Sequence, residues 1–182
     1  MAGAVTQNDP KSQRSPEPCI RFEDVIREHQ RMIHSLCYRM TGSVADADDL
    51  TQETFLHAYH HLKGFRAEAR ISSWLYRIAV NQCLNWRKRV VRREQLHDQW
   101  SHERGRADGP PAARAQLIEE ALFKLTPKQR AVVVLTTYDG LSHAEAAQVL
   151  GCAETTVSWR LFAARRHLKR LLKTAWKSEP SV

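Results

Sequence analysis

Two blocks of helical periodicity, separated by a polar stretch, limit what this chain can fold into. Gly and Pro are scarce inside both blocks, and the alternation of β-branched residues that marks strands is almost absent. Residues 97–114 are rich in charge, Gly and Pro, which is typical of a flexible linker. The sequence therefore predicts an all-α protein with two small helical domains. The expected parts are a disordered tail at 1–19, a first domain at 20–93, a linker at 94–115 and a second domain at 116–176.

The charge balance narrows the class of partner. The 182 residues include 28 Lys and Arg against 20 Asp and Glu, which gives a net charge of +8 and a pI of about 9.6. Such a balance favours nucleic acid or an anionic membrane surface. No run of 18 apolar residues exists, and residues 1–18 contain no apolar stretch, so we expect neither a membrane span nor a secretory signal but a cytoplasmic protein.

Cysteine and histidine give little support for a metal or redox site. None of the cysteines forms a Cys-x-x-Cys pair, and we interpret them as reduced, small apolar residues. They are Cys19, Cys37, Cys83 and Cys152. Glu53, His57 and His61 would share one helical face, but nothing supplies a fixed fourth ligand, so a solvated face is the favoured interpretation. We expect no metal and no cofactor.

The segment 48–62 predicts a helix with one acidic face. The residues expected to face the core are Thr51, Phe55, Ala58, Tyr59 and Leu62. The opposite face carries Asp49, Gln52, Glu53, Leu56 and His60. An acidic face on a basic protein repels DNA and suits a basic protein surface. The alternative is ordinary solubilising charge, since acids near a helix start also favour the helix dipole.

The next helix is expected to begin near Ser72 or Ser73 and to have two different faces. Its apolar arc holds Leu75, Tyr76, Ala79, Val80, Cys83 and Trp86. The opposite face presents Trp74, Arg77, Asn81, Asn85 and Lys88. An aromatic ring, amides and cations on one face suit single-stranded DNA, through stacking, base-edge hydrogen bonds and phosphate contacts. The alternative is that Trp74 is a half-buried core residue and that the asparagines are surface residues without a binding role.

Cations flank this helix on both sides. In the loop before it, Phe65 and Arg66 are followed by Arg70, and the two arginines could rim a pocket for a flipped base. At its end, residues 87–93 contain five Lys or Arg and no acid. Such a run suits phosphate contacts of low sequence specificity, although charge runs are often merely solvated.

The second block has the spacing of a helix-turn-helix. Thr126 is a good N-cap for a helix that keeps residues 132–134 helical and ends near Gly140. Ser142 and Glu145 form a capping-box pattern, and Gly151 supplies a tight turn before a long final helix. The core stripe of that final helix is expected at Val157, Leu161, Ala164, Leu168, Leu171 and Leu172.

The outer face of the final helix is basic and partly aromatic. Residues 154–173 hold six Lys or Arg against one Glu. The outward residues are Glu154, Thr155, Ser158, Trp159, Phe162, Arg165, Arg166 and Lys169, together with Arg170. In a recognition helix the first of these would read base edges and the later cations would hold phosphates. Trp159 and Phe162 would contact thymine methyls and sugars, or pack on a partner or on the other domain. The alternative is an amphipathic helix in a plain bundle.

These segments together resemble a known family. Residues 46–56 (DADDLTQETFL) look like region 2.2 of bacterial RNA polymerase sigma factors of the extracytoplasmic-function (ECF) subgroup. Phe65-Arg66 with residues 73–81 (SWLYRIAVN) look like regions 2.3 and 2.4, and residues 125–172 look like region 4. The resemblance spans about residues 20–173. It implies a sigma factor that binds core RNA polymerase and promoter DNA, without catalytic residues of its own.

The resemblance also implies roles for the residues. Asp49, Gln52 and Glu53 would contact the coiled-coil clamp of the polymerase β′ subunit, and the second domain would contact the β flap. Residues 65–71 with Trp74, Arg77 and Asn81 would open the −10 element and hold its non-template strand. Residues 154–170 would read the −35 element. Many family members are held inactive by an anti-sigma factor, which is a possible partner.

This chain departs from the family pattern in its recognition helix. It has Ser158-Trp159-Arg160 where a basic residue and Ser often precede the Arg, and Ala163 where an Arg usually follows the Leu-Phe pair. We therefore expect a promoter element unlike the common one, with Trp159 carrying part of the readout.

Two other functions stay open. A free-standing helix-turn-helix regulator would bind duplex DNA tightly without polymerase, but it leaves the acidic face and the face of Trp74 and Asn81 unexplained. An enzyme with a metal at the histidine cluster would retain stoichiometric metal after purification.

Overall fold

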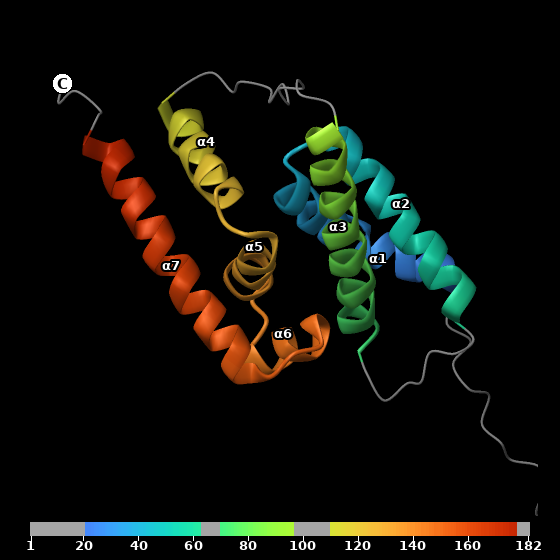
Figure 1. Cartoon of the computed structure of the whole chain (residues 1–182). Coiled ribbons are helices and arrows are strands. Elements are labelled where there is room, and N and C mark those ends of the chain that lie inside the picture. Colours follow the sequence, from blue (N-terminus) through green and yellow to red (C-terminus); the bar gives the residue numbers. More distant parts are fainter. Residues whose placement is uncertain (1–20, 63–69, 97–109, 178–182) are drawn as a thin grey trace, which may run out of the picture.

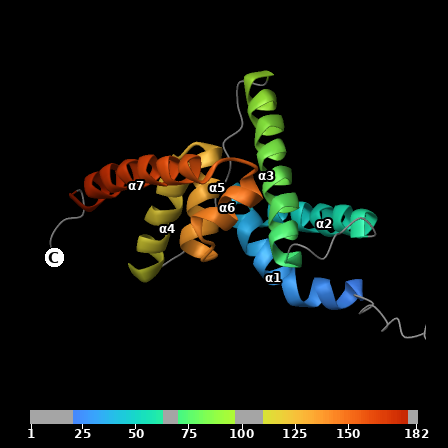
Figure 2. The ribbon, with the colours of Figure 1, turned by 90° about the horizontal axis from the view of Figure 1, so that it is seen from below.

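The computed structural model describes residues 21–62, 70–96 and 110–177. Its elements are α1 (Phe22–Thr41), α2 (Val44–His61), α3 (Ile71–Leu96), α4 (Pro110–Phe123), α5 (Pro127–Val133), the π-helical segment η2 (Val134–Tyr138), α6 (His143–Leu150) and α7 (Glu154–Lys177). No strand occurs in these ranges. Figures 1 and 2 show α1 to α3 gathered on one side and α4 to α7 on the other, which confirms two helical domains.

The first domain is a bundle of α1, α2 and α3. Gly42 ends α1 in the left-handed conformation, with φ 78°, and Ser43 caps α2 by accepting a hydrogen bond from the N–H of Asp46. This tight turn makes the first two helices neighbours. Apolar side chains at helical spacing then close the core. The fully buried ones include Ile33, Leu36, Cys37, Leu50, Leu75, Val80 and Cys83.

One residue that was predicted to lie in the core is exposed. Phe55 and Ala58 are buried as expected, but Tyr59 is 60% exposed. Its ring centroid lies 5.3 Å from that of Phe22, the first residue of α1. The tyrosine therefore packs at the end of the bundle, beside the first residue of α1, rather than in the core.

The helices also reach into the stretch expected to be linker. Helix α3 continues to Leu96, and α4 already begins at Pro110, where a proline suits the first turn of a helix. Residues 94–96 and 110–115 of the predicted linker are therefore helical. The predicted tail at 1–19 and the rest of the linker lie outside the described residues.

The second domain follows the predicted capping signals. The Thr126 hydroxyl accepts a hydrogen bond from the N–H of Gln129, whose side chain accepts one from the N–H of Thr126. Ser142 and Glu145 form the same reciprocal pair at the start of α6. Gly151 has φ 60° at the end of α6, and α7 follows after a short turn. The helix-turn-helix is thus built as local sequence signals predict.

The valine run is helical, but the helix changes its pitch within it. Helix α5 ends at Val133, and η2 continues as a wider π-helical turn. The N–H of Asp139 donates to the carbonyl of Val134 at 3.0 Å and closes this wide turn. The wider turn brings Asp139 to the surface that faces the first domain.

The two domains are in direct contact. Arg130 is only 4% exposed, and its Nη1 donates to the carbonyl of Met40 in α1 at 2.8 Å. The Arg39 guanidinium lies 4.6 Å from the ring centroid of Tyr138, and α3 packs on α6. The buried apolar cluster runs without a break from one domain to the other. The domains therefore share one core, although a linker joins them in sequence.

A half-buried carboxyl at this contact makes the stability depend on pH. Burial raises the pKa of Asp139 from 3.8 to about 6, while Arg39 lowers it in part. Its Oδ2 accepts no hydrogen bond from any described residue. Because the folded state binds this proton more tightly than the unfolded state does, the free energy of unfolding falls as the pH rises from 3.8 to about 6.

Asp139→Asn should remove that pH dependence. At pH 7 we expect the variant to be more stable by about 1 kcal/mol, discounted for the partial exposure of the group. Urea unfolding at pH 4 to 8 measures the effect. Exposed Asp49→Asn is the matched control and should keep the wild-type slope. An unchanged slope in Asp139→Asn would contradict the prediction.

Candidate nucleic-acid and partner interfaces

Helix α2 presents the acidic face that its sequence predicts. Asp49, Gln52 and Glu53 are all exposed, while Leu50 and Thr54 on the other side are buried. Leu56 on the same outer face is 60% exposed, so an apolar contact is available beside the acids. A basic partner surface with an apolar centre would complement this face.

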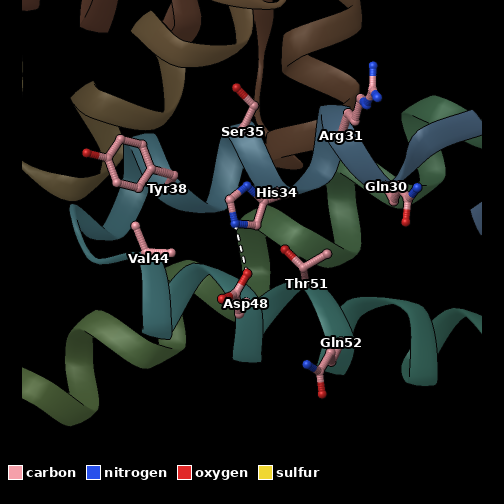
Figure 3. Close-up of a pocket in the computed structure, with 9 residues that line it drawn as sticks. All are labelled: Gln30, Arg31, His34, Ser35, Tyr38, Val44, Asp48, Thr51 and Gln52. Atoms are coloured by element: carbon pink, nitrogen blue, oxygen red, sulfur yellow. Dashed lines mark ion pairs between the residues drawn. The ribbon is translucent and has the colours of Figure 1, made fainter.

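A groove between α1 and α2 adjoins the acidic face. It has a volume of about 670 Å³, and Figure 3 shows His34 and Asp48 meeting across it, with Nε2 and Oδ1 3.0 Å apart. Both side chains are partly exposed. Gln52 lines the groove, so one residue of the predicted partner surface belongs to both features. No local sequence pattern predicts this groove, because it depends on how two helices pair.

Helix α3 presents the predicted polar face. Its exposed members are Arg77, Asn81, Asn85 and Lys88, to which the last residue before the helix, Arg70, is added. Trp74 is only partly exposed and packs against the core. It therefore lies at the border between the two faces, with part of its side chain exposed. Phe65 and Arg66 lie outside the described residues.

A hydrogen bond between helices fixes the direction of α3. The indole Nε1 of Trp86 donates to Oδ1 of Asp46 in the first turn of α2, at 3.0 Å. Beyond this point α3 carries the basic run, in which Lys88, Arg89, Arg92 and Arg93 are exposed. The bond thus orients a cationic helix end relative to the acidic face. No local pattern pairs Trp86 with Asp46, and the sequence analysis missed it.

Helix α7 keeps its two predicted faces apart. Val157, Leu161 and Ala164 are buried. Every outward residue is exposed: Glu154, Thr155, Ser158, Trp159, Phe162, Arg165, Arg166, Lys169 and Arg170. Trp159 and Phe162 are 68% and 66% exposed, so neither packs on the other domain. Large apolar rings so exposed within a basic face are available for contacts with bases and sugars.

A side-chain contact links the two helices of the helix-turn-helix. Nδ1 of His143 lies 3.0 Å from Oγ of Ser158, joining the first turn of α6 to the outer face of α7. The neighbouring capping box draws the pKa of Glu145 below its usual value, through hydrogen bonds from the backbone and side chain of Ser142. The first turn of α6 is thus well ordered next to the predicted reading residues. No local pattern in the sequence indicates the contact between His143 and Ser158.

The histidine cluster remains a surface feature in the described ranges. The His57 and His61 ring centroids are 4.2 Å apart, and His61 Nδ1 lies 2.8 Å from the His57 carbonyl oxygen. Burial, His61 and His60 together lower the pKa of His57. Among the residues that the structure places, no three His, Cys, Asp or Glu side chains are arranged to hold a metal ion. Nor is any helix there both long and apolar enough for a membrane span.

Known proteins share this organisation. Residues 25–93 match the protein family described as Sigma-70 region 2. Residues 115–168 match the family described as Sigma-70, region 4. The chain is 37% identical over 158 residues to the ECF RNA polymerase sigma factor SigM of Mycobacterium tuberculosis. The matched region covers 83% of this chain and 76% of that relative. It is 32% identical over 166 residues to SigW of Bacillus subtilis, covering 84% and 89%.

A solved structure shares the fold as well. It is the sigma factor RpoE in complex with the anti-sigma factor NepR, from Bartonella quintana. The TM-score is 0.72 at 25% identity, over 84% of this chain and 96% of the other. The match spans both helical domains.

Proposed function

The chain belongs to the ECF sigma factors of the sigma-70 family, which direct RNA polymerase to promoters, and we propose that it does so through three exposed faces. They are the acidic face of α2, the polar face of α3 and the basic face of α7. The observation that carries this assignment is their segregation by charge. One acidic face and two cationic faces, all exposed, lie on different helices of this small protein.

The acidic face of α2 docks on the polymerase. In this proposal Asp49, Gln52 and Glu53 contact the basic coiled-coil clamp of β′, and the second domain contacts the β flap. Opposite charges across such an interface speed encounter and exclude DNA from the same surface. Exposed Leu56 adds an apolar contact at the centre.

The other two faces bind the promoter. The exposed polar residues of α3 would hold the unpaired strand of the −10 element: Arg77, Asn81, Asn85 and Lys88. The partly exposed side chain of Trp74 would lie beside a base. Arg70, Phe65 and Arg66 precede these residues in the sequence. On α7, the first outward residues, Glu154 to Phe162 on the exposed face, would read base edges in the major groove of the −35 element, and Arg165, Arg166 and Lys169 would hold phosphates. Melting is driven by binding energy, so the chain needs no catalytic group of its own.

Regulation and location follow from the same assignment. The relative RpoE is known in complex with an anti-sigma factor, and we propose that this chain also has such a partner, which competes with polymerase for it. A candidate partner that leaves core binding unchanged would not fill this role. The chain acts in the cytoplasm, where bacterial polymerase and promoter DNA are found.

Binding to core RNA polymerase tests the proposed function. The Gln52→Ala/Glu53→Ala double variant should bind core at least about tenfold more weakly, because it removes a charge and an amide from the docking face. Fluorescence titration of labelled protein with core measures this. The control is Glu23→Ala/Glu28→Ala, two exposed residues of α1 that do not line the groove.

Binding and transcription experiments with the wild-type protein distinguish a sigma factor from a free-standing regulator. Core binding together with promoter-dependent transcripts from a fragment library would support a sigma factor. Absence of core binding, with tight binding to duplex DNA alone, would instead favour a free-standing helix-turn-helix regulator.

Trp159 should contribute to promoter selection. Because its ring is exposed on the reading face, Trp159→Ala should weaken transcription from the preferred promoters several-fold and change the ranking of sequences in the −35 library. Core affinity should stay at the wild-type value. Thr137→Ala, an exposed substitution in η2, serves as the control. An unchanged ranking and unchanged affinity would contradict this role.

A further inference from the structure

Two cysteines that are far apart in sequence meet inside the first domain. Cys37 lies on α1 and Cys83 on α3, and their Sγ atoms are 3.9 Å apart. Both thiols are free, and the residues are 0% and 1% exposed. Cys152, the third cysteine in the described ranges, lies in the second domain next to Arg160 and is partly exposed. The facing thiols are therefore a pair, which the spacing of the cysteines in sequence does not indicate.

The two thiols are not equivalent. The hydrogen bond from Cys83 lowers the pKa of Cys37, and the hydroxyl of Thr51 lowers it further, against the effect of burial. The same contact, together with burial, raises the pKa of Cys83 well above its usual value. Negative charge is thus favoured on the Cys37 sulfur, which makes it the nucleophile of the pair.

We propose that Cys37 and Cys83 form a reversible oxidation site, which hydrogen peroxide converts into a disulfide. The Cys37 thiolate attacks one peroxide oxygen, the O–O bond breaks, and the sulfur becomes a sulfenic acid while hydroxide leaves and takes up a proton. The Cys83 sulfur then attacks the sulfenic sulfur, loses its proton and releases water. In total, two thiols are oxidised by two electrons and the peroxide is reduced to two waters.

Geometry allows this step with little rearrangement. A disulfide needs a sulfur separation of about 2.05 Å, so the two sulfurs must approach by about 2 Å in total. The bond would join α1 to α3 and close a loop that contains all of α2. Such a cross-link restricts the unfolded chain and stabilises the domain. Because both thiols are buried, we expect oxidation to be slow in the native state and to follow local opening of the helices.

Oxidation of the full-length protein with hydrogen peroxide tests the proposal. Remaining thiols are blocked with maleimide, and peptides are mapped by mass spectrometry without reductant. We expect a peptide pair that links Cys37 to Cys83, and a thermal midpoint raised by about 5 °C or more. Dithiothreitol should reverse both changes. Cys152→Ser should behave like the wild type, whereas Cys37→Ala and Cys83→Ala should lose the link and the thermal shift.

Other products would overturn the proposal. These are free Cys37 and Cys83 after peroxide treatment, oxidation of either to a sulfinic acid without a link, or links only to Cys152 or Cys19, the latter outside the described residues. A link between Cys37 and Cys83 that forms only in denaturant would overturn it too. If an alanine variant does not fold, the peptide map of the unmodified sequence still decides.

Discussion

Replacing Arg130 with alanine should lower the free energy of unfolding by about 3–5 kcal/mol, because several buried carbonyls lose a donor at once. The buried guanidinium donates to the carbonyls of Met40, Leu122 and Phe123 at 2.8, 3.0 and 2.7 Å. It also lies 4.3 Å from the ring centroid of Phe123. Alanine leaves these carbonyls without that donor, and it removes the bond that joins the second domain to α1. Urea unfolding followed by circular dichroism measures the loss.

Two further variants separate the effect of Arg130 from a general effect of charge. Lys128→Ala removes an exposed cation from the same helix and should change stability by less than about 0.5 kcal/mol. Arg130→Lys keeps the charge but cannot reach several carbonyls at once, so it should recover only part of the loss. A loss below about 1 kcal/mol in Arg130→Ala would mean that the carbonyls find other donors.

Gly42→Ala should be the second severe substitution, with a loss of about 2–4 kcal/mol. Gly42 has φ +78°, which alone costs an alanine about 1–2 kcal/mol. A Cβ there would also lie 2.5 Å from Cζ of Phe123, across the domain contact. The ring has little freedom to move, since the guanidinium of Arg130 covers one face. Thermal and urea unfolding would measure the change.

The chain offers a matched control for the clash. Gly140 has φ +71°, but a Cβ there would meet nothing within 4 Å, so Gly140→Ala should show only the backbone cost. In a double-mutant cycle, Gly42→Ala with Phe123→Ala should be less destabilised than the sum of the single changes. Additive losses, or equal losses at both glycines, would show that the domains do not meet at Gly42 in solution.

Together these variants show how far the contact between domains contributes to folding. Met40 and Gly42 at the end of α1 meet the second domain through one hydrogen bond from the buried Arg130 guanidinium and through the Phe123 ring that lies beside Gly42. A contact of this kind depends on geometry at both ends. It is therefore sensitive to single substitutions on either side.

Features that depend on neighbours within a few residues could be predicted from the amino-acid sequence. The caps at Thr126 and Ser142 and the turn at Gly151 were predicted at the positions where the structure has them. The polar face of α3 and the basic face of α7 were likewise predicted, because residues at helical spacing share a face wherever the helix packs. Periodicity and capping are local, so a single chain carries them.

Which distant residues meet depends on the tertiary structure. Cys37 and Cys83 stand far apart in the sequence, and no local pattern links Arg130 to Met40, Trp86 to Asp46 or His143 to Ser158. Tyr59 follows the apolar period of α2, yet it lies exposed beside the first residue of α1. These features depend on where one helix ends relative to another. That relation is set by the packing of the whole core, which no local pattern encodes.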